Sequence, residues 1–295
     1  MRAVVSGGML AGLESLGLRD TFDAVYGSSA GAINGAYFIA GQATFGTTVY
    51  YESINNTRFI NGARFLSGRP VMSLDFLLNR IMTEEKPLDW EAVVKSNISL
   101  HVVATRVDSV QSCDLTNLHT KQELFAAFCA SATIPVVAGG PVDFLGAPYL
   151  DATLLESFPY RTALADGCDH VLVLRTRSLE SRLGPPSFFN RRVVAPLLAR
   201  HNPALREVVL SRPERYNADA ETLERAMRDE TATPSIYSVC PSADRPGVGR
   251  LEKDRTRLVA GAASGLIAVW EAISGDTPKT VEVLVACSDF GRPIT

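Results

Sequence analysis

The chemistry that this sequence can support centres on a serine between two glycines. Gly27-Ser28-Ser29-Ala30-Gly31 fits the pattern G-x-S-x-G. It follows a short apolar run over residues 22–26 and precedes a segment of small residues over 32–40. A strand, a sharp turn and a helix in this order form a nucleophile elbow, which exposes a serine oxygen for attack on a carbonyl carbon. We therefore predict that Ser29 is a nucleophile; the alternative is a serine-glycine turn without chemistry.

The place of this turn in the chain restricts the fold. Both flanking glycines are expected to be required, because side chains at those positions would collide in so tight a turn. Only about 25 residues precede Gly27, which leaves room for little more than two strands and one helix. An α/β-hydrolase places several strands before its nucleophile. The sequence therefore argues against an ordinary α/β-hydrolase.

A catalytic triad would also need a histidine, and the chain has four. His101 and His170 lie in or beside predicted strands, whereas His119 and His201 lie in polar stretches. None of them lies in a loop of catalytic character. His170 and His201 stay open as alternatives, because they come late in the chain, as the histidine of a hydrolase triad does.

Three blocks of sequence resemble the patatin-like phospholipase family. The first is the elbow itself, continued by Ala32-Ile33-Asn34-Gly35. The second is Ala130 to Pro135 (ASATIP), which is similar to the family's Ala-Ser-x-x-Ile-Pro segment. The third is Tyr149 to Pro159 (YLDATLLESFP), which resembles its Y-x-D-G-G-x-x-x-N-x-P element. The order and spacing of the blocks match over roughly residues 3–175.

The resemblance implies a fold and a mechanism. The implied fold is α/β: a three-layer α/β/α sandwich of patatin type with a central, mostly parallel sheet. The implied catalytic residues are Ser29 and Asp151, a dyad in which the aspartate takes the serine proton directly. Gly7 and Gly8 would supply an oxyanion hole. The implied substrates are lipid esters, and the mechanism uses neither a metal nor a cofactor.

Two positions depart from the family pattern. Ala152 stands where the family has a glycine after the aspartate, which is tolerable only if the backbone there has a negative φ. The glycine-rich loop of the family is three glycines followed by an arginine and a glycine, but residues 6–12 read SGGMLAG, without the arginine. Removing one oxyanion donor costs about 10²–10³ in kcat in other enzymes. The expected result is a weaker enzyme.

Other aspartates compete with Asp151 for the role of base. Asp166-Gly167 spells the family dipeptide but precedes a strand and has no proline element after it, so we expect a turn there. Asp143 is expected in the hairpin that leads to Asp151. Asp169 begins a buried strand.

The elements that must hold these residues alternate between strands and helices in the first half of the chain, as in a sheet covered by helices on both faces. We predict strands at 3–5 (ending in a glycine turn at 6–8), 22–26, 99–106, 148–150, 169–174, 235–240 and 281–286, and helices at 9–18, 32–40, 123–132, 191–212, 218–228 and 254–273. The patatin-like core is expected over 1–178. Residues 179–295 are expected to form a mainly helical extension that packs on the core as part of one structural domain.

Composition restricts the partners and the compartment. The chain has 295 residues, is 46% hydrophobic and carries a net charge of -3, so nothing favours nucleic acid. The five cysteines are scattered without a CxxC pair, which favours inert thiols in a reducing compartment. We expect a cytoplasmic protein without a leader or a membrane span. Contact with membranes would then be peripheral.

One segment suits such contact. Ser187 to Val194 combines two phenylalanines with two arginines, and Arg200 and Arg206 follow, as in a basic amphipathic stretch on an anionic membrane. The alternative is a helix with a solvated face. Two rival functions also stay open: a patatin-like protein that binds lipid or a partner without hydrolysis, and an acyltransferase that uses the same serine.

Overall fold

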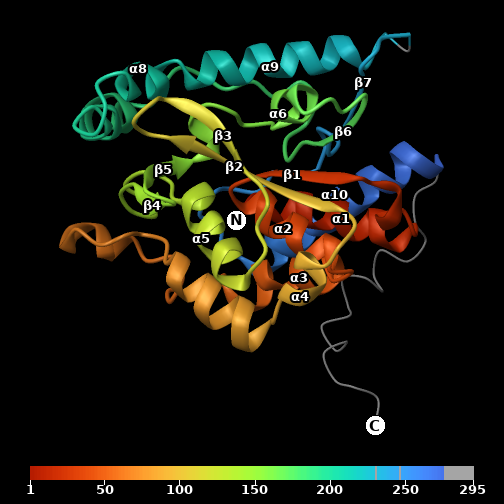
Figure 1. The fold of residues 1–295 in the computed structure, drawn as a ribbon, viewed down its shortest axis with the longest axis horizontal. Coiled ribbons are helices and arrows are strands. Elements are labelled where there is room, and N and C mark those ends of the chain that lie inside the picture. Colours follow the sequence, from red (N-terminus) through yellow and green to blue (C-terminus); the bar gives the residue numbers. More distant parts are fainter. Residues whose placement is uncertain (230, 246, 276–295) are drawn as a thin grey trace.

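Strands and helices form layers in the computed structural model of the chain, which describes residues 1–229, 231–245 and 247–275. A twisted sheet runs through the middle, with α1, α2, α3 and α10 on one side and α6, α8 and α9 on the other (Figure 1). This is the α/β architecture that the sequence predicts. The strands are β1 (Ala24–Ser28), β2 (Ser99–Arg106), β3 (Gln111–Leu115), β4 (Val142–Phe144), β5 (Ala147–Asp151), β6 (His170–Leu174) and β7 (Ser235–Val239).

The helices differ widely in length. They are α1 (Val4–Ser15), α2 (Ala30–Ile39), α3 (Ala43–Thr48), α4 (Trp90–Val94), α5 (Lys121–Ala132), α6 (Tyr160–Ala165), α7 (Ala195–Leu198), α8 (Leu205–Leu210), α9 (Arg212–Ala226) and α10 (Arg255–Ser274). Three π-helices span Val49–Ser53, Phe76–Glu85 and Asn190–Val194 in the described residues, and the last of them leads into α7. The helix predicted over 191–212 is thus broken into several short pieces.

The main sheet is mixed and is organised around β2. β1 pairs parallel with residues 99–103 of β2, and β5 pairs antiparallel with residues 104–106. β3 pairs with residues 102–106, which overlap both of these ranges. A residue of a strand can pair with a neighbouring strand on each of two sides. β3 therefore lies along one edge of β2, and β1 and β5 both lie along the other edge. β1 and β5 therefore meet end to end.

A second, two-stranded parallel sheet joins the two parts of the chain. β6 pairs along its whole length with β7, which comes from the region after residue 178. The boundary predicted at 178 stays a prediction, but β7 and α10 show that this region adds a strand and a core helix as well as surface helices. The predicted strand over 281–286 lies outside the described residues.

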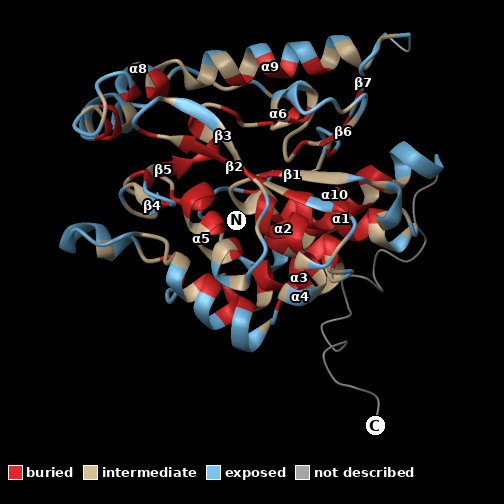
Figure 2. Cartoon of the chain, in the orientation of Figure 1, coloured by how far each residue is buried: buried red, intermediate tan, exposed pale blue. Residues whose placement is uncertain are grey.

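Buried residues lie on both faces of the sheets (Figure 2). The largest cluster lies among α1, α2, α5, α10 and β2. Two smaller clusters lie on the opposite face. In one, the π-helix Asn190–Val194, α7 and α8 pack against β5, and in the other α9 packs against β6 and β7. Burial of apolar surface on both faces is the main force that fixes the strand ends described below.

The start of the chain differs from its prediction. The expected strand at 3–5 and glycine turn at 6–8 are wrong, because α1 runs without a break from Val4 to Ser15. The glycines are needed for helix packing: a Cβ at Gly8 would lie 1.9 Å from the carbonyl oxygen of Ala262, and one at Gly265 would lie 1.9 Å from that of Val5. α1 and α10 therefore touch backbone to backbone.

This packing also bears on α10. Among the described residues, α10 is the one helix whose length and apolar composition would suit a membrane span. Its buried residues include Leu258, Leu266 and Val269, which belong to the largest core cluster. Such packing is typical of the core helix of a globular domain.

Candidate active site

The elbow predicted around Ser29 is present. β1 ends at Ser28, α2 begins at Ala30, and Ser29 between them has φ 57° and ψ -128°. A non-glycine residue in this region of backbone space costs about 1–3 kcal/mol and persists only where its surroundings hold it. A Cβ at Gly27 would lie 2.4 Å from the amide nitrogen of Ala32, so this glycine is required. At Gly31 a Cβ would meet nothing within 4 Å, so the second glycine is not required by sterics.

A buried serine from α5 holds the elbow in place. The amide of Ser29 donates to Ser131 Oγ at 2.8 Å, and Ser131 Oγ donates to the carbonyl oxygen of Val103 in β2 at 2.6 Å. Ser131 is fully buried. One hydroxyl thus ties the strained residue to the middle of the sheet. The Ala130–Pro135 block pointed to this segment, but nothing in the sequence indicated the role of Ser131.

Asp151 is the last residue of β5 and is 1% exposed. Its amide donates to the carbonyl oxygen of Thr133 at 3.0 Å, and its carbonyl accepts from Thr105 Oγ1 at 3.0 Å. Its Oδ1 accepts from both the amide and the hydroxyl of Thr153, at 2.9 and 2.6 Å. Its Oδ2 is buried and has no hydrogen-bond partner. Because buried polar atoms are almost always paired, an orphaned carboxylate oxygen calls for a functional explanation.

The sheet brings the two residues together. Ser28 is opposite Val103 and Asp151 is opposite Ala104, on the same edge of β2. Successive residues of a strand rise only about 3.3 Å, so β1 and β5 point their carboxyl ends at each other across about one residue step. Ser29 and Asp151 both line one cavity of about 1010 Å³. No hydrogen bond joins their side chains among the described residues.

Comparison with known proteins agrees with this geometry. The family model of the patatin-like phospholipases matches residues 1–164, more than half of the chain. The chain belongs to the patatin-like phospholipase family. It is also similar to the uncharacterized protein YjjU of Escherichia coli (strain K12), with 28% identity over 184 residues. That alignment covers 59% of this chain and 51% of YjjU, so it spans only about half the length of that relative.

The two departures from the patatin-like pattern have different outcomes. Ala152 is buried in a 3-10 turn and is not among the residues with positive φ, so its methyl group is tolerated. Gly7 and Gly8 lie within α1, the amide of Gly7 donates to the carbonyl oxygen of Ala3, and neither glycine lines the cavity. The oxyanion role predicted for them would need a different conformation of this segment.

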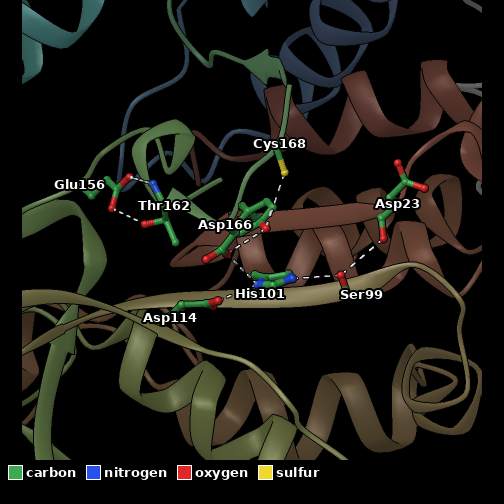
Figure 3. Close-up of polar contacts among 9 residues, drawn as sticks. Asp23, Ser99, His101, Asp114, Glu156, Thr162, Asp166 and Cys168 are labelled. Carbon is green, nitrogen blue, oxygen red and sulfur yellow. Dashed lines mark hydrogen bonds and ion pairs between the residues drawn. The ribbon is translucent and has the colours of Figure 1, made fainter. Parts of the chain in front are cut away.

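One buried residue next to the site, Glu156, forms hydrogen bonds with β1, β3 and α6. Glu156 is 4% exposed, and its carboxylate accepts from the amide and hydroxyl of Thr162 in α6 (Figure 3). The same carboxylate accepts from the hydroxyl of Ser112 in β3. Its backbone carbonyl accepts from Ser28 Oγ at 3.1 Å. Glu156 therefore fixes the loop after Asp151 to the end of β1.

Among the described residues, no histidine forms a hydrogen bond with Ser29. His101 Nδ1 is 2.6 Å from Asp114 Oδ2 (Figure 3). The His101 ring stacks on the ring of Tyr26, with 4.1 Å between the centroids. Ligand atoms of His101, Asp114 and Asp166 lie within 4.8 Å of one another, as a metal site would require. However, Asp166 already accepts from the Tyr26 hydroxyl, whose pKa is raised by burial, so the phenol stays a donor. We interpret this cluster as a clamp between β1, β2, β3 and α6.

The remaining histidines and rival aspartates are exposed, and two of them, His170 and Asp169, also line the cavity. His170 is exposed and bonds to Asp169, whose pKa the imidazole lowers. His119 and His201 are exposed. Asp143 is exposed in β4.

Arg212 is a neighbour of the site that sequence reasoning missed. It begins α9 and lines the cavity, and its Nε donates to the carbonyl oxygen of Thr153 at 2.7 Å. Burial and the positive charge of Arg250 lower its pKa to about 10, while the charge of Asp151 acts in the opposite direction. No motif marks this arginine, because it lies outside the three blocks of the family pattern.

Proposed function

We propose that this chain is a serine acyl hydrolase that cleaves carboxylic ester bonds of lipids, as a phospholipase A, lysophospholipase or lipase does, with Ser29 as nucleophile and Asp151 as base. Family membership supports action on lipid esters in general. The observation that carries the assignment of residues is the end-to-end meeting of β1 and β5 on one edge of β2. It sets a strained serine and an orphaned carboxylate oxygen at the wall of the same cavity.

The proposed first step is acylation of the enzyme. Ser29 Oγ adds to the ester carbonyl carbon while its proton passes to Asp151 Oδ2. Oδ1 stays bonded to Thr153, which fixes the orientation of the carboxylate. The tetrahedral intermediate then expels the alcohol, which takes the proton back from Asp151. In the second step Asp151 removes a proton from water, the water oxygen adds to the acyl-enzyme, and the fatty acid leaves as Ser29 recovers its proton.

The oxyanion of both steps needs donors. The amide of Ala30, the residue after the nucleophile, lies in the first turn of α2, where backbone N–H groups have no partner within the helix. Ala30 and Gly31 both line the cavity. The open space beside Gly31 leaves this part of the backbone accessible to a substrate. We therefore assign the first oxyanion donor to Ala30, in place of the amides of Gly7 and Gly8.

The cavity also offers room for an acyl chain. Its wall includes Leu10 of α1, Phe38 of α2 and Leu77 of the π-helix Phe76–Glu85. A concave, mostly apolar pocket with a few convergent polar groups is the usual form of a small-molecule site. In this proposal the polar groups are those at the ends of β1 and β5.

The test combines a covalent probe with turnover. A fluorophosphonate probe should label the wild type, and p-nitrophenyl esters should be hydrolysed. Ser29→Ala should abolish both, and Asp151→Asn should lower kcat/KM at least about 10³-fold, because a triad member removed elsewhere costs as much or more. Asp143→Asn, the same change at an exposed aspartate of β4, is the matched control and should retain activity.

The outcomes separate the rival functions. Turnover in Asp151→Asn close to that of the wild type would refute the dyad. A folded wild type that neither labels nor hydrolyses esters between pH 6 and 9 would favour a lipid-binding protein without hydrolysis. Transfer of the acyl group to an added alcohol or lysolipid in preference to water would favour the acyltransferase.

We propose further that the protein is cytoplasmic and meets membranes through a peripheral contact. Phe188 is 76% exposed and Leu66 is 89% exposed, and the rings of Phe65 and Phe189 lie 6.2 Å apart. The segment Gly62–Ser67 projects from the body of the molecule (Figure 2). Arg191 and Arg192 are exposed beside these aromatic residues. Flotation with anionic vesicles should fall in Arg191→Glu with Arg192→Glu; unchanged flotation would contradict the contact.

A further inference from the structure

Four arginines converge on the cavity that holds Ser29. Arg2 precedes α1, Arg177 follows β6, Arg212 begins α9, and Arg250 lies between β7 and α10. All four line the cavity. They come from four distant parts of the chain, so their convergence is a property of the fold and has no counterpart in a local sequence pattern.

The side chains of three of these arginines donate hydrogen bonds, and all of these bonds go to neutral oxygen atoms. Arg2 Nε donates to the carbonyl oxygen of Val248 at 3.1 Å, and Arg177 Nη1 donates to Ser181 Oγ at 3.4 Å. Arg212 donates to the carbonyl oxygen of Thr153. These bonds hold the side chains of Arg2, Arg177 and Arg212 and leave other N–H groups of their guanidinium groups uncommitted.

None of the four forms an ion pair among the described residues, although many other arginines of the chain do. The paired ones include Arg106 with Asp108, Arg182 with Glu224 and Arg245 with Glu271. Arg250 is exposed, whereas Arg2, Arg177 and Arg212 are half-buried. A charge withdrawn from water is normally paired, because removing it from water without a partner is costly. A cluster of unpaired arginines is therefore a feature that the fold alone does not explain.

The arginines also repel one another. Burial, followed by the charges of Arg177 and Arg250, lowers the pKa of Arg2 to about 10, and the pKa of Arg212 falls to about 10 for similar reasons. Asp151 is the carboxylate that offsets this positive charge at Arg212. A bound anion would relieve both the repulsion and the loss of hydration.

The acidic residues of the cavity wall, apart from Asp151, lie at the other ends of the strands. Asp23 directly precedes β1 and Asp169 directly precedes β6, whereas Ser29 and Arg177 come after the last residues of these strands. The wall is thus positive where the strands end and negative where they begin. Ligands of α/β proteins bind beyond the carboxyl ends of the strands, which is the positive end here.

We propose that Arg2, Arg177, Arg212 and Arg250 form a subsite for the phosphate group of an ester substrate whose acyl carbonyl lies at Ser29. The proposal rests on the hydrolase function proposed above. Phosphate suits the site because planar guanidinium groups donate to its oxygens in pairs and because its charge of up to two matches several arginines. A neutral ester would gain nothing from this part of the cavity.

Binding can be tested without catalysis. In the Ser29→Ala protein, titration calorimetry should detect glycerol 3-phosphate. The change Arg177→Gln with Arg250→Gln should weaken this affinity at least tenfold. The matched control is Arg225→Gln with Arg228→Gln, which removes the same charge from exposed positions at the end of α9 and should retain it. Equal affinity in the two double variants, or no binding by the parent protein at millimolar ligand, would overturn the subsite.

Kinetics then distinguish a substrate phosphate from free phosphate. The ratio of kcat/KM for dihexanoyl glycerol phosphate to that for neutral dihexanoyl glycerol should fall at least tenfold in Arg177→Gln with Arg250→Gln. An unchanged ratio, with inorganic phosphate bound as tightly as glycerol 3-phosphate, would contradict a substrate role. If the wild type hydrolyses neither ester, the proposed function fails, and the calorimetry still decides whether the subsite exists.

Discussion

Ser131→Ala tests the link between the Ala130–Pro135 block and the elbow. The change removes the acceptor of the Ser29 amide and the donor to the Val103 carbonyl, which now bond at 2.8 and 2.6 Å. Each buried group left unpaired costs about 1–3 kcal/mol, so for these two groups we expect a loss of about 2–6 kcal/mol in the free energy of unfolding. The backbone strain at Ser29, about 1–3 kcal/mol, would then be free to relax.

Relaxation of the elbow should also affect activity. A displacement of about 1 Å at a reacting group can cost about 10² in rate, so we expect fluorophosphonate labelling and kcat to fall by roughly 10- to 100-fold. Urea unfolding followed by circular dichroism measures the stability. Ser67→Ala is the control, because Ser67 Oγ makes a single exposed bond to the carbonyl oxygen of Arg64. If Ser131→Ala resembles Ser67→Ala in both stability and labelling, the serine does not hold the elbow.

Three further predictions concern helix packing, the orientation of the base and the charge of the cavity. Gly8→Ala places a methyl group 1.9 Å from the Ala262 carbonyl oxygen and should destabilise the fold by at least about 1–3 kcal/mol in urea unfolding. The control is Gly62→Ala, whose methyl group meets nothing within 4 Å and should not destabilise the fold. Equal unfolding midpoints for the two variants would contradict the packing of α1. Thr153→Val keeps the hydrogen bond from the backbone amide to Asp151 and loses the one from the hydroxyl. We expect kcat to fall about tenfold with little change in stability. An unchanged kcat would show that the hydroxyl bond is dispensable. Phosphate affinity, measured by calorimetry, should fall as pH rises through about 10, because Arg212 loses its charge near that pH; affinity constant to pH 11 would contradict the lowered pKa. The folded-state pKa of Arg212 lies below its ordinary value of 12.5, so the folded protein loses this proton at a lower pH than the unfolded chain does. The contribution of Arg212 to the free energy of unfolding therefore rises with pH above about 10. A loss of phosphate affinity in this range would then not be explained by unfolding that Arg212 causes.

Local patterns predicted the elements around the dyad well. β2 has the predicted bounds, because a β-branched run on a central strand has no competing local structure. α5 begins at a capping box between Thr120 and Glu123, two residues from the predicted start. The elbow was predictable because the steric need at Gly27 is local: the atoms that exclude a side chain there belong to the same turn.

The features that failed or were missed depend on partners far away in the chain. Gly7-Gly8 is compatible with a turn and also with a close helix crossing, and only the position of Ala262 decides between them. The meeting of Ser29 and Asp151 depends on which edge of β2 each strand occupies. The arginine cluster draws one residue from each of four distant segments. Periodicity and motifs carry no information about such pairings.

The contact between α1 and α10 can form only late in synthesis, because the two helices lie near opposite ends of the described chain. Trp270 Nε1 donates to Ser15 Oγ at 3.0 Å across 255 residues of chain, and the glycine contacts of the same helix pair are equally remote in sequence. At about 5–20 residues per second, a ribosome would need roughly 10–50 s to deliver α10 after α1 emerges. During this time the face of α1 that carries Gly8 and Gly12 lacks α10, the helix against which it packs. Nascent chains that stop short of α10 would therefore expose an apolar helix face to chaperones and proteases.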